Sequence, residues 1–515
     1  MLVFWRLPRR SSTAWRPILS CMMARVRDVY ANVIGLLRAI VRLFFQRVTV
    51  TGLENVPAQG GGLVVAWHPN GLIDPVLIAT SCPRRLTFGA RDGLFQWPLL
   101  GSLMRAIGTV PIYRAADAGQ GAPDEGRRAR NRQSLDRLAQ AIAEGSFSAL
   151  FPEGVSHDAP HLTEIKVGAA RLYYRAVELT PPGAPSPVIL PVGLHYDDKH
   201  VFRSRALVAF HPPLRLPAEL AQPPASGSDE ALRARATALT AAVERALVDI
   251  VRPTESWQLH HLMHRTRTLL RAERAHRAGV RHDESDMDER ELGFERVWRA
   301  YNMRRQSDPG PSAALLARVD IYDSALRGLG LRDDEIDADP RIVSPLLPAL
   351  LLLQALFVYV LLPPILIAGY AINVTPYVLI NVIAKRSAKL DKDLATVKLF
   401  AGLVLMPLAW LLFATLCALG VVQLHDLFPS VPDAPLSTAA CGFALAAAGG
   451  FLALRYSELA AETWRALRVC FMRRRYAEAL AHLREERAAL HDAIEAMGEG
   501  IALPGRLSVD GRITP

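Results

Sequence analysis

Three uncharged apolar stretches in the last third of this chain limit its possible folds more than any other feature. They cover residues 345–384, 400–424 and 439–454, and none of them contains Asp, Glu, Lys or Arg. A helix that crosses a bilayer needs about 20 predominantly apolar residues. A buried helical domain of a soluble protein is the alternative, but stretches so free of charge favour membrane-spanning helices. We therefore expect residues 341–455 to form a transmembrane helical region.

The first stretch is too long for one untilted span and holds Pro363-Pro364 in its middle, which favours a tight helical hairpin. The loop that follows is expected in the cytoplasm, because loops rich in Lys and Arg stay on that side. Its basic residues are Lys385, Arg386, Lys389, Lys392 and Lys398. Residues 426–435 have no Lys or Arg and are expected outside, and the charged helical tail 456–515 returns to the cytoplasm.

The first half of the chain alternates between short β-rich runs and helical stretches. One helix is clear from its amphipathic pattern over residues 128–144, and Gly145 is typical of a helix C-terminus. This alternation predicts an α/β domain over residues 48–217, with a mixed sheet flanked by helices. The expected strands are 62–67, 86–88, 109–113, 146–151, 188–190 and 207–210.

Residues 1–47 are predicted to form a basic arm and an amphipathic helix, the helix running over residues 26–48. Its apolar face holds Val33, Leu37, Ile40, Val41 and Phe44, while Arg27, Arg38 and Arg42 lie on another face. Two interpretations are open: a helix lying in the membrane surface, or an ordinary helix packed on its own domain. Residues 218–340 begin as a linker and continue as a charged, Arg-rich helical region whose role the sequence does not indicate.

The charge balance favours an anionic partner. The 60 Lys and Arg residues outnumber the 50 Asp and Glu residues, for a formal net charge of +10. No nucleic-acid-binding motif or aromatic platform accompanies this charge, so anionic lipid and phosphorylated metabolites are the expected partners and nucleic acid is not. The 5 Cys residues form no C-x-x-C, which argues against a disulfide scaffold or a zinc site.

A histidine and an aspartate follow the first expected strand of the α/β domain. His68 lies at the strand end, where a turn of Pro, Asn and Gly presents it at the rim of the sheet. Asp74 can accept a hydrogen bond from one ring nitrogen, which fixes the tautomer and makes the other nitrogen a better base. Such a pair can take a proton from an alcohol that attacks an acyl carbonyl. No Gly-x-Ser-x-Gly elbow is present, so a serine nucleophile is not expected.

Further polar residues predict a pocket for a phosphorylated polyol. The planar guanidinium of Arg114 suits phosphate, and Glu153 can accept hydrogen bonds from a polyol. Gly154 allows a close backbone approach, and Lys166 and Arg171 add positive charge. Each residue also has a plain structural alternative: a surface ion pair for the three cations and a helix start for Glu153.

A group of histidines lies elsewhere, on a probable helix, at His260, His261 and His264. Histidines four residues apart on a helix can bind a metal. No acidic companion motif accompanies them, so we expect a solvated helix face and no metal site.

Four segments of the α/β domain together resemble the glycerol-phosphate and lysophosphatidic acid acyltransferase superfamily. They are 67–75, 108–114, Phe151-Pro-Glu-Gly-Val-Ser156 and 188–194. The family pattern has four residues between its His and Asp, whereas five separate His68 from Asp74, and Trp67 stands where Asn often precedes the His. Fungal-type glycerol-3-phosphate and dihydroxyacetone phosphate acyltransferases look similar in this longer spacing and in having a long helical and membrane part.

The resemblance implies a role for each matching residue. His68 would be the general base, Asp74 its orienting partner, and Arg114 the ligand of the acceptor phosphate. Phe151, Pro152, Glu153 and Gly154 would shape the glycerol-phosphate pocket, and Pro191 would lie on the acyl-donor side. We add Lys166 and Arg171 as further phosphate contacts. The acyl donor would be acyl-CoA or acyl carrier protein, and no metal or other cofactor would be required.

These expectations combine into a membrane-bound acyltransferase of glycerophospholipid synthesis. Its α/β domain would lie on the cytoplasmic face and transfer an acyl group to glycerol-3-phosphate or dihydroxyacetone phosphate. Two alternatives stay open. The acceptor could instead be a lysophospholipid, or the chain could be a non-catalytic membrane protein whose acyltransferase-like domain binds lipid or a partner.

Overall fold

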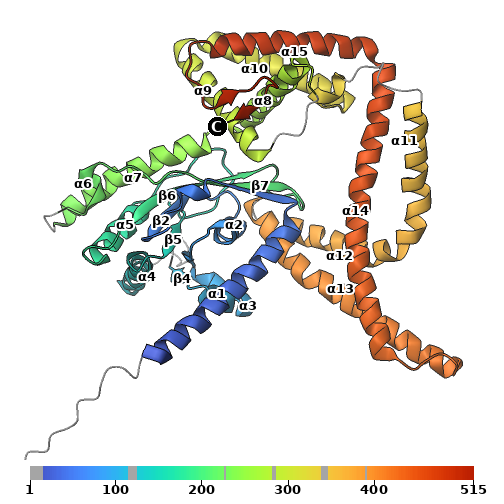
Figure 1. Ribbon diagram of the computed structural model, residues 1–515, viewed down its shortest axis with the longest axis horizontal. Coiled ribbons are helices and arrows are strands. Elements are labelled where there is room, and N and C mark those ends of the chain that lie inside the picture. The colour runs from blue at the N-terminus through green and yellow to red at the C-terminus, as the bar shows by residue number, and fades with distance from the viewer. Residues whose placement is uncertain are drawn as a thin grey trace, which may run out of the picture. The chain divides into compact units, whose positions relative to one another are not determined.

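The computed structural model describes residues 16–113, 125–224, 228–280, 286–337, 346–388 and 391–514 (Figure 1). The chain divides into two compact units. The first consists of Met1–His157 and Leu162–Val251, and the second of Asp158–His161 and Arg252–Pro515. The first unit therefore continues past residue 217 and includes α7 (Asp229–Val251).

A seven-stranded mixed sheet forms the centre of the described part of the first unit. Its strand order is β1-β7-β6-β2-β5-β3-β4, and every neighbouring pair is parallel except β6 and β7. The predicted mixed sheet is therefore confirmed. The strands are β1 (Arg47–Thr51), β2 (Gly62–Ala66), β3 (Leu86–Arg91), β4 (Val110–Ile112), β5 (Phe147–Leu150), β6 (Val188–Tyr196) and β7 (Arg205–Phe210).

All six expected strands are present, and two features differ from the prediction. β6 runs on to Tyr196 instead of ending at residue 190. The helix expected over residues 26–48 ends at Phe44, and β1 follows it. Val48 to Thr51 are all β-branched, and such side chains fit a strand better than a helix.

Helices cover both faces of the sheet. α4, α5 and α7 pack over one face, where Leu63 and Val65 of β2 belong to the main buried core. The helix predicted over residues 128–144 is confirmed as α4. Besides α7, the described helices of this unit are α1 (Arg16–Phe44), α2 (Ile73–Ser81), α3 (Pro98–Ala106), α4 (Glu125–Ala143), α5 (Gly168–Leu179) and α6 (Ala218–Ala221), with 3-10 turns η1 (Leu53–Asn55) and η2 (Asp92–Gln96).

The amphipathic helix α1 packs on its own unit, against α2 and α3. Ile34, Leu37, Val41 and Phe44 are buried. Arg38 Nε donates to the carbonyl of Thr80 in α2 at 3.0 Å. Two interpretations of this helix were left open. The burial of its apolar face supports a helix that packs on its own domain.

The second unit contains a helical bundle closed by a short hairpin. Its larger core joins α8, α10 and α15 through residues such as Leu269, Tyr322 and Leu490. The elements are α8 (Trp257–Arg277), α9 (Met287–Ser307), α10 (Pro309–Leu329), the 3-10 turn η4 (Asp333–Ile336), α15 (Ala477–Gly498), β8 (Arg506–Leu507) and β9 (Ile513–Thr514).

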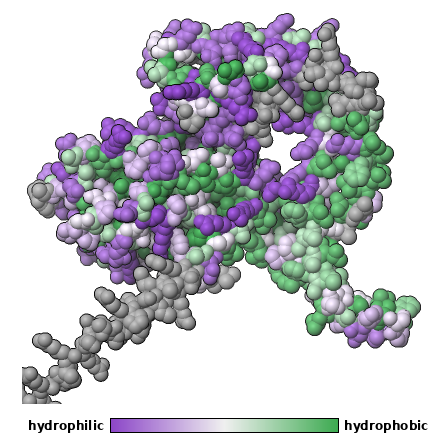
Figure 2. All heavy atoms as spheres, in the orientation of Figure 1, coloured by the Kyte–Doolittle hydropathy of each residue, from purple (hydrophilic) through white to green (hydrophobic). Residues whose placement is uncertain are grey.

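Long apolar helices make up the rest of the second unit. Among the described residues, Asp393–Leu427 and Pro435–Arg475 are each long and apolar enough to cross a membrane. Figure 2 shows apolar residues over the visible surface of α12, α13 and α14. The elements are α11 (Leu346–Leu356), the π-helical turn η5 (Phe357–Leu361), α12 (Leu362–Ser387), α13 (Asp391–Leu427) and α14 (Pro435–Arg475).

The apolar stretch 345–384 does not form the tight hairpin that was expected. Its two parts, Ala349–Pro364 and Gly369–Ser387, are bent by 89°, which is far from a reversal, and they count as a third span only if taken together. The chain stays helical through the π-helical turn before Pro363-Pro364. Proline lacks an N–H and clashes with the preceding turn, so the pair bends the helix here without ending it.

Small and polar residues join the three long helices. Gly369 of α12 and Gly449 of α14 approach so closely that a Cβ on Gly369 would lie 2.8 Å from the Cα of Gly449. Asn373 of α12 donates to the carbonyl of Ala446 in α14 at 2.9 Å and accepts from Trp410 Nε1 of α13 at 2.8 Å. Close glycine contacts and interhelical hydrogen bonds are typical of helix packing in membranes.

Candidate active site

His68 and the segment from Phe151 to Gly154 come together because two neighbouring strands end at the same edge of the sheet. β2 and β5 are adjacent and parallel, with Val65 opposite Leu150. His68 follows the end of β2, and Phe151 follows β5 directly. The carboxyl ends of parallel strands beside a crossover are the usual ligand site of such sheets. Two segments far apart in sequence therefore form one site.

His68 and Asp74 form a hydrogen-bonded pair at this edge. His68 Nδ1 lies 2.8 Å from Asp74 Oδ2. The Asp74 side chain is fully buried, whereas His68 keeps 13% of its side chain exposed. The turn after His68 closes with the Ile73 N–H donating to the Asn70 carbonyl at 3.0 Å, which places Asp74 in the first turn of α2. Five intervening residues are thus compatible with a direct His–Asp contact.

Two further donors hold the Asp74 carboxylate. The Asn70 N–H donates to Oδ2 at 2.7 Å, and the Tyr196 hydroxyl donates to Oδ1 at 2.5 Å. With the ring nitrogen of His68, the buried carboxylate has three partners, which offsets the cost of its burial. The helix N-terminus also favours its negative charge. If His68 Nδ1 carries the proton, its Nε2 is left as an acceptor.

Tyr196 was not among the predicted site residues. Burial, followed by the negative charge of Asp74, raises the pKa of Tyr196 well above its ordinary value of 10. The hydroxyl is therefore protonated at neutral pH and can donate to the carboxylate. Tyr196 ends β6, which lies beside β2 in the sheet, and nothing in the sequence near residue 196 indicates that neighbourhood.

Glu153 accepts hydrogen bonds from the protein itself, whereas a contact with a polyol was expected. Its side chain is fully buried, and both oxygens accept from the protein's own donors. Oε2 accepts the backbone N–H of His68 at 3.0 Å, while Oε1 accepts the N–H of Thr163 at 2.9 Å and lies 2.5 Å from His157 Nε2. Glu153 therefore positions the His68 backbone and the loop after β5.

Phe151 and Gly154 have direct structural roles beside the pair. The rings of Phe151 and His68 are stacked, with centroids 4.0 Å apart and planes 10° from parallel. Pro152, between Phe151 and Glu153, accepts the Lys166 N–H at 2.9 Å. Gly154 has a φ of +72°, and a Cβ there would lie 3.1 Å from Lys166 Nζ. Lys166 Nζ therefore lies close to this turn, and its contact with phosphate stays a prediction.

The other predicted contacts are less directly placed. Arg114 lies outside the described residues. Arg171 is exposed on α5, and among the described residues no hydrogen bond or ion pair joins it to His68 or Asp74. Pro191 is buried in β6, where it lies opposite Val65 inside the sheet. Their roles in phosphate or acyl-donor binding stay predictions.

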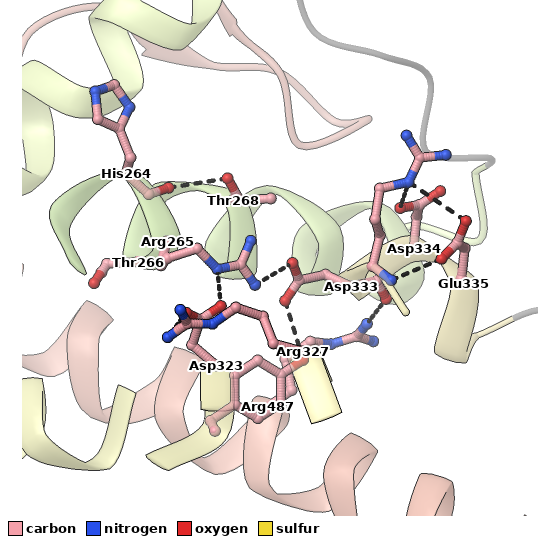
Figure 3. Close-up of polar contacts among 12 residues, drawn as sticks. His264, Arg265, Thr266, Thr268, Asp323, Arg327, Asp333, Asp334, Glu335 and Arg487 are labelled. Carbon is pink, nitrogen blue, oxygen red and sulfur yellow. Dashed lines mark hydrogen bonds and ion pairs between the residues drawn. The ribbon is translucent and has the colours of Figure 1, made fainter. Parts of the chain in front are cut away.

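The histidines of α8 lie beside acidic and aromatic side chains. In the described part of the chain, no group of three or more His, Cys, Asp or Glu is placed to hold a metal ion. His261 pairs with Asp323 at 3.2 Å, and His264 lies 3.2 Å from His260. Figure 3 shows that the neighbouring polar cluster is dominated by arginine–carboxylate pairs. Arg265 bridges Asp323 and Asp333 there.

Family models match two separate parts of the chain. Residues 47–195 match the Acyltransferase model. Residues 300–500 match the model described as the Glycerol-3-phosphate acyltransferase 2 C-terminal domain. The first match spans His68, Asp74 and the Phe151–Gly154 turn, and the second spans α10 to α15 with the long apolar helices between them.

Individual proteins match shorter parts of the chain. An uncharacterized acyltransferase of Schizosaccharomyces pombe is 22% identical in an alignment of 271 residues that covers 37% of this chain and 40% of the relative. Glycerol-3-phosphate O-acyltransferase 1 of Saccharomyces cerevisiae is 36% identical over 84 residues, 16% of this chain and 11% of the relative. The chain thus covers less than half of either relative. The crystal structure of the lysophosphatidic acid acyltransferase PlsC of Thermotoga maritima is 19% identical, with a TM-score of 0.30, over 44% of this chain and 83% of that chain.

Proposed function

We propose that this chain, whose residues 47–195 form an acyltransferase-family domain, is a membrane-bound O-acyltransferase. It would move a fatty acyl group from a thioester, acyl-CoA or acyl carrier protein, to a hydroxyl of glycerol-3-phosphate or dihydroxyacetone phosphate. The observation that carries this proposal is the His68–Asp74 pair, with its carboxylate buried and its imidazole partly exposed at the sheet edge.

The geometry supports direct transfer with His68 as the base. Asp74 accepts from Nδ1, so Nε2 can take the proton of the acceptor hydroxyl as that oxygen attacks the thioester carbonyl. The new carbon–oxygen bond replaces the carbon–sulfur bond, and the imidazolium returns the proton to the leaving thiolate. Asp74 stabilises the imidazolium that forms between these events, and the stacked Phe151 holds the ring in place.

A phosphorylated acceptor is supported by charge and by the comparisons. Lys166 lies against Gly154 beside the site, and Arg114 is the further predicted phosphate ligand. The yeast relative is named a glycerol-3-phosphate O-acyltransferase, and residues 300–500 match a domain named after the same activity. Both names favour glycerol-3-phosphate over a lysophospholipid.

A membrane location would release the acylated product directly into the bilayer. The apolar helices α13 and α14 would hold the protein in a bilayer, and the basic residues that flank them favour a cytoplasmic position for the α/β domain. A water-soluble acyl thioester and a phosphorylated acceptor would then meet at the membrane that receives the acylated product.

An acceptor panel tests this function. The full chain in detergent is given one acyl-CoA and, separately, glycerol-3-phosphate, dihydroxyacetone phosphate, lysophosphatidic acid or lysophosphatidylcholine. We expect the acylated product from glycerol-3-phosphate or dihydroxyacetone phosphate, measured by lipid mass spectrometry. Turnover of lysophospholipids alone would establish the alternative acceptor. No transfer to any acceptor from either acyl-CoA or acyl carrier protein would favour the non-catalytic alternative.

Tyr196→Phe is expected to lower kcat by about tenfold with KM little changed, because a hydrogen bond to a charged group contributes roughly 1.5–3 kcal/mol. Losing this donor leaves Asp74 Oδ1 without its partner, so the carboxylate that orients His68 is held less firmly. The measurement is kcat and KM, determined separately. Tyr173→Phe is the control, since that hydroxyl donates to the Ala221 carbonyl on α6. Unchanged kcat in Tyr196→Phe would contradict the positioning role.

A further inference from the structure

Four arginines surround one cavity in the helical bundle of the second unit. The cavity lies between α8, α9 and the β8–β9 hairpin, and its open volume is about 330 Å³ when the space at its mouth is included. The cavity is open to solvent on one side. The lining residues are Arg267, Leu270, Arg271, Arg274, Glu289, Gly293, Arg296 and Ile513.

The protein holds these guanidinium groups in place while using only part of their hydrogen-bonding capacity. Arg271 Nε donates to Glu289 at 2.9 Å, and its Nη1 donates to the Asp510 carbonyl at 3.1 Å. Arg296 Nη1 donates to the carbonyls of Pro504 and Gly505. A guanidinium has five N–H donors, so each of these two keeps donors that no described residue accepts from.

Two glycines make the arrangement possible. A Cβ on Gly293 of α9 would lie 2.7 Å from Arg267 Cγ, so only glycine lets the Arg267 stem cross this helix. A Cβ on Gly511, in the turn of the hairpin, would lie 2.6 Å from Arg274 Cβ, and the φ of +77° there also favours glycine. The side chain of Arg267 and the start of the Arg274 side chain therefore pack closely against these two glycines.

Arg296 has no carboxylate partner among the described residues. The one carboxylate in the lining, that of Glu289, pairs with Arg271. Arg274 is also paired with Glu495, but burial, and then the nearby charge of Arg274, still lower the pKa of Arg296 below its ordinary value of 12.5. The buried arginines of Figure 3 differ, because Arg265 and Arg487 are each matched by two carboxylates. A bound anion would relieve the repulsion in this cavity.

We propose that this cavity is a binding site for a phosphate group. Guanidinium groups bind phosphate oxygens through paired N–H donors, and several arginines at once are suited to a doubly charged phosphate monoester. A phosphate at the open mouth would face these arginines and leave the rest of a larger ligand in solvent. The ligand is therefore a phosphate monoester, either a free phosphorylated metabolite or the headgroup of an anionic lipid. This site does not depend on the acyl-transfer proposal.

The test is thermal unfolding of the full chain in detergent, titrated with inorganic phosphate and with sodium chloride at matched ionic strength. We expect a saturable rise of the midpoint with phosphate, since a ligand that binds only the folded protein stabilises it. Arg296→Gln should weaken the apparent phosphate affinity at least tenfold, and Arg296→Lys should recover part of it. The control is Arg299→Gln, which removes the same charge from an exposed residue of α9 that pairs with Glu295 at 2.7 Å.

A comparison of two nanodisc compositions distinguishes a lipid headgroup from a free phosphate ester as the ligand. Nanodiscs of phosphatidylcholine alone are compared with nanodiscs that contain phosphatidic acid. Loss of the phosphate response only with phosphatidic acid identifies a lipid headgroup, whereas an equal response in both identifies a free phosphate ester. A phosphate response weakened by Lys166→Gln but not by Arg296→Gln would assign the response to the first unit and overturn the proposal. No saturable response in the unmodified chain, or equal weakening by Arg296→Gln and Arg299→Gln, would overturn the proposal.

Discussion

His68→Ala is expected to reduce the rate of acyl transfer by about 10²–10⁴-fold, the usual contribution of a general base. The imidazole is the partly exposed member of the pair, and no second base is hydrogen-bonded to Asp74 among the described residues. Alanine leaves the hydroxyl proton to water. The measurement is initial rate with the best acceptor of the panel under saturating acyl donor, so that the change is read in kcat.

The folded state should survive this substitution, which separates lost chemistry from lost structure. Asp74 keeps two donors in the variant, the Asn70 N–H and the Tyr196 hydroxyl. The backbone N–H of residue 68 still donates to Glu153. His261→Ala is a suitable control, because His261 is half exposed on α8 and belongs to the second unit. Retained turnover in His68→Ala with an unchanged unfolding midpoint would rule out His68 as the base.

The sequence predicted the residues that lie at strand ends and missed those that depend on which strands are neighbours. His68 and Phe151 each follow a recognisable buried strand, so their meeting required only that the two strands be parallel and adjacent. Tyr196 reaches Asp74 because β6 crosses over to lie beside β2. No local pattern encodes that crossover. The burial of Glu153 was missed for the same reason, since one of its donors, the His68 N–H, follows a neighbouring strand that is distant in sequence.

For the long apolar helices, composition predicted the location of each helix but not its geometry. Uncharged stretches predicted where apolar helices lie, because a span is defined mainly by the absence of charge. They did not predict where each helix ends. α14 continues as one helix to Arg475, well beyond the uncharged residues 439–454, since charged residues are no obstacle to a helix that has left the apolar layer. Likewise, Pro363-Pro364 marked a break without specifying its angle.

Arg487→Met is expected to lower the free energy of unfolding of the helical bundle by about 3–5 kcal/mol, as is usual when one partner of a buried ion pair is removed. The Arg487 side chain is fully buried. Its Nε donates to Glu273 at 2.8 Å, and its Nη2 donates to Asp337 at 2.6 Å. Nη1 also donates to the Asp333 carbonyl, as Figure 3 shows. One side chain thus joins α8, η4 and α15. Methionine fills a similar volume but leaves these acceptors without their donor.

The pH dependence of this loss identifies its electrostatic origin. Burial acts to raise the pKa of Glu273, but hydrogen bonds from Arg277 and Arg487 hold that pKa below its ordinary value of 4.5. A carboxyl with a lowered pKa stabilises the fold above pH 4.5 and loses this contribution as pH falls through its folded pKa. The difference in stability between Arg487→Met and the unmodified chain should therefore be largest at neutral pH and shrink below pH 4.5.

Arg318→Met on α10 is the matched control for this buried pair. Arg318 pairs with Glu486 of α15 at 2.9 Å, but the two side chains are 44% and 32% exposed. An exposed pair contributes about 0–1 kcal/mol, so this variant should unfold almost as the unmodified chain does. Chemical denaturation from pH 4 to 7, followed by the loss of helical circular dichroism, measures both variants. Equal losses in the two variants, or a loss in Arg487→Met that does not change with pH, would show that the buried charges do not hold η4 to the bundle.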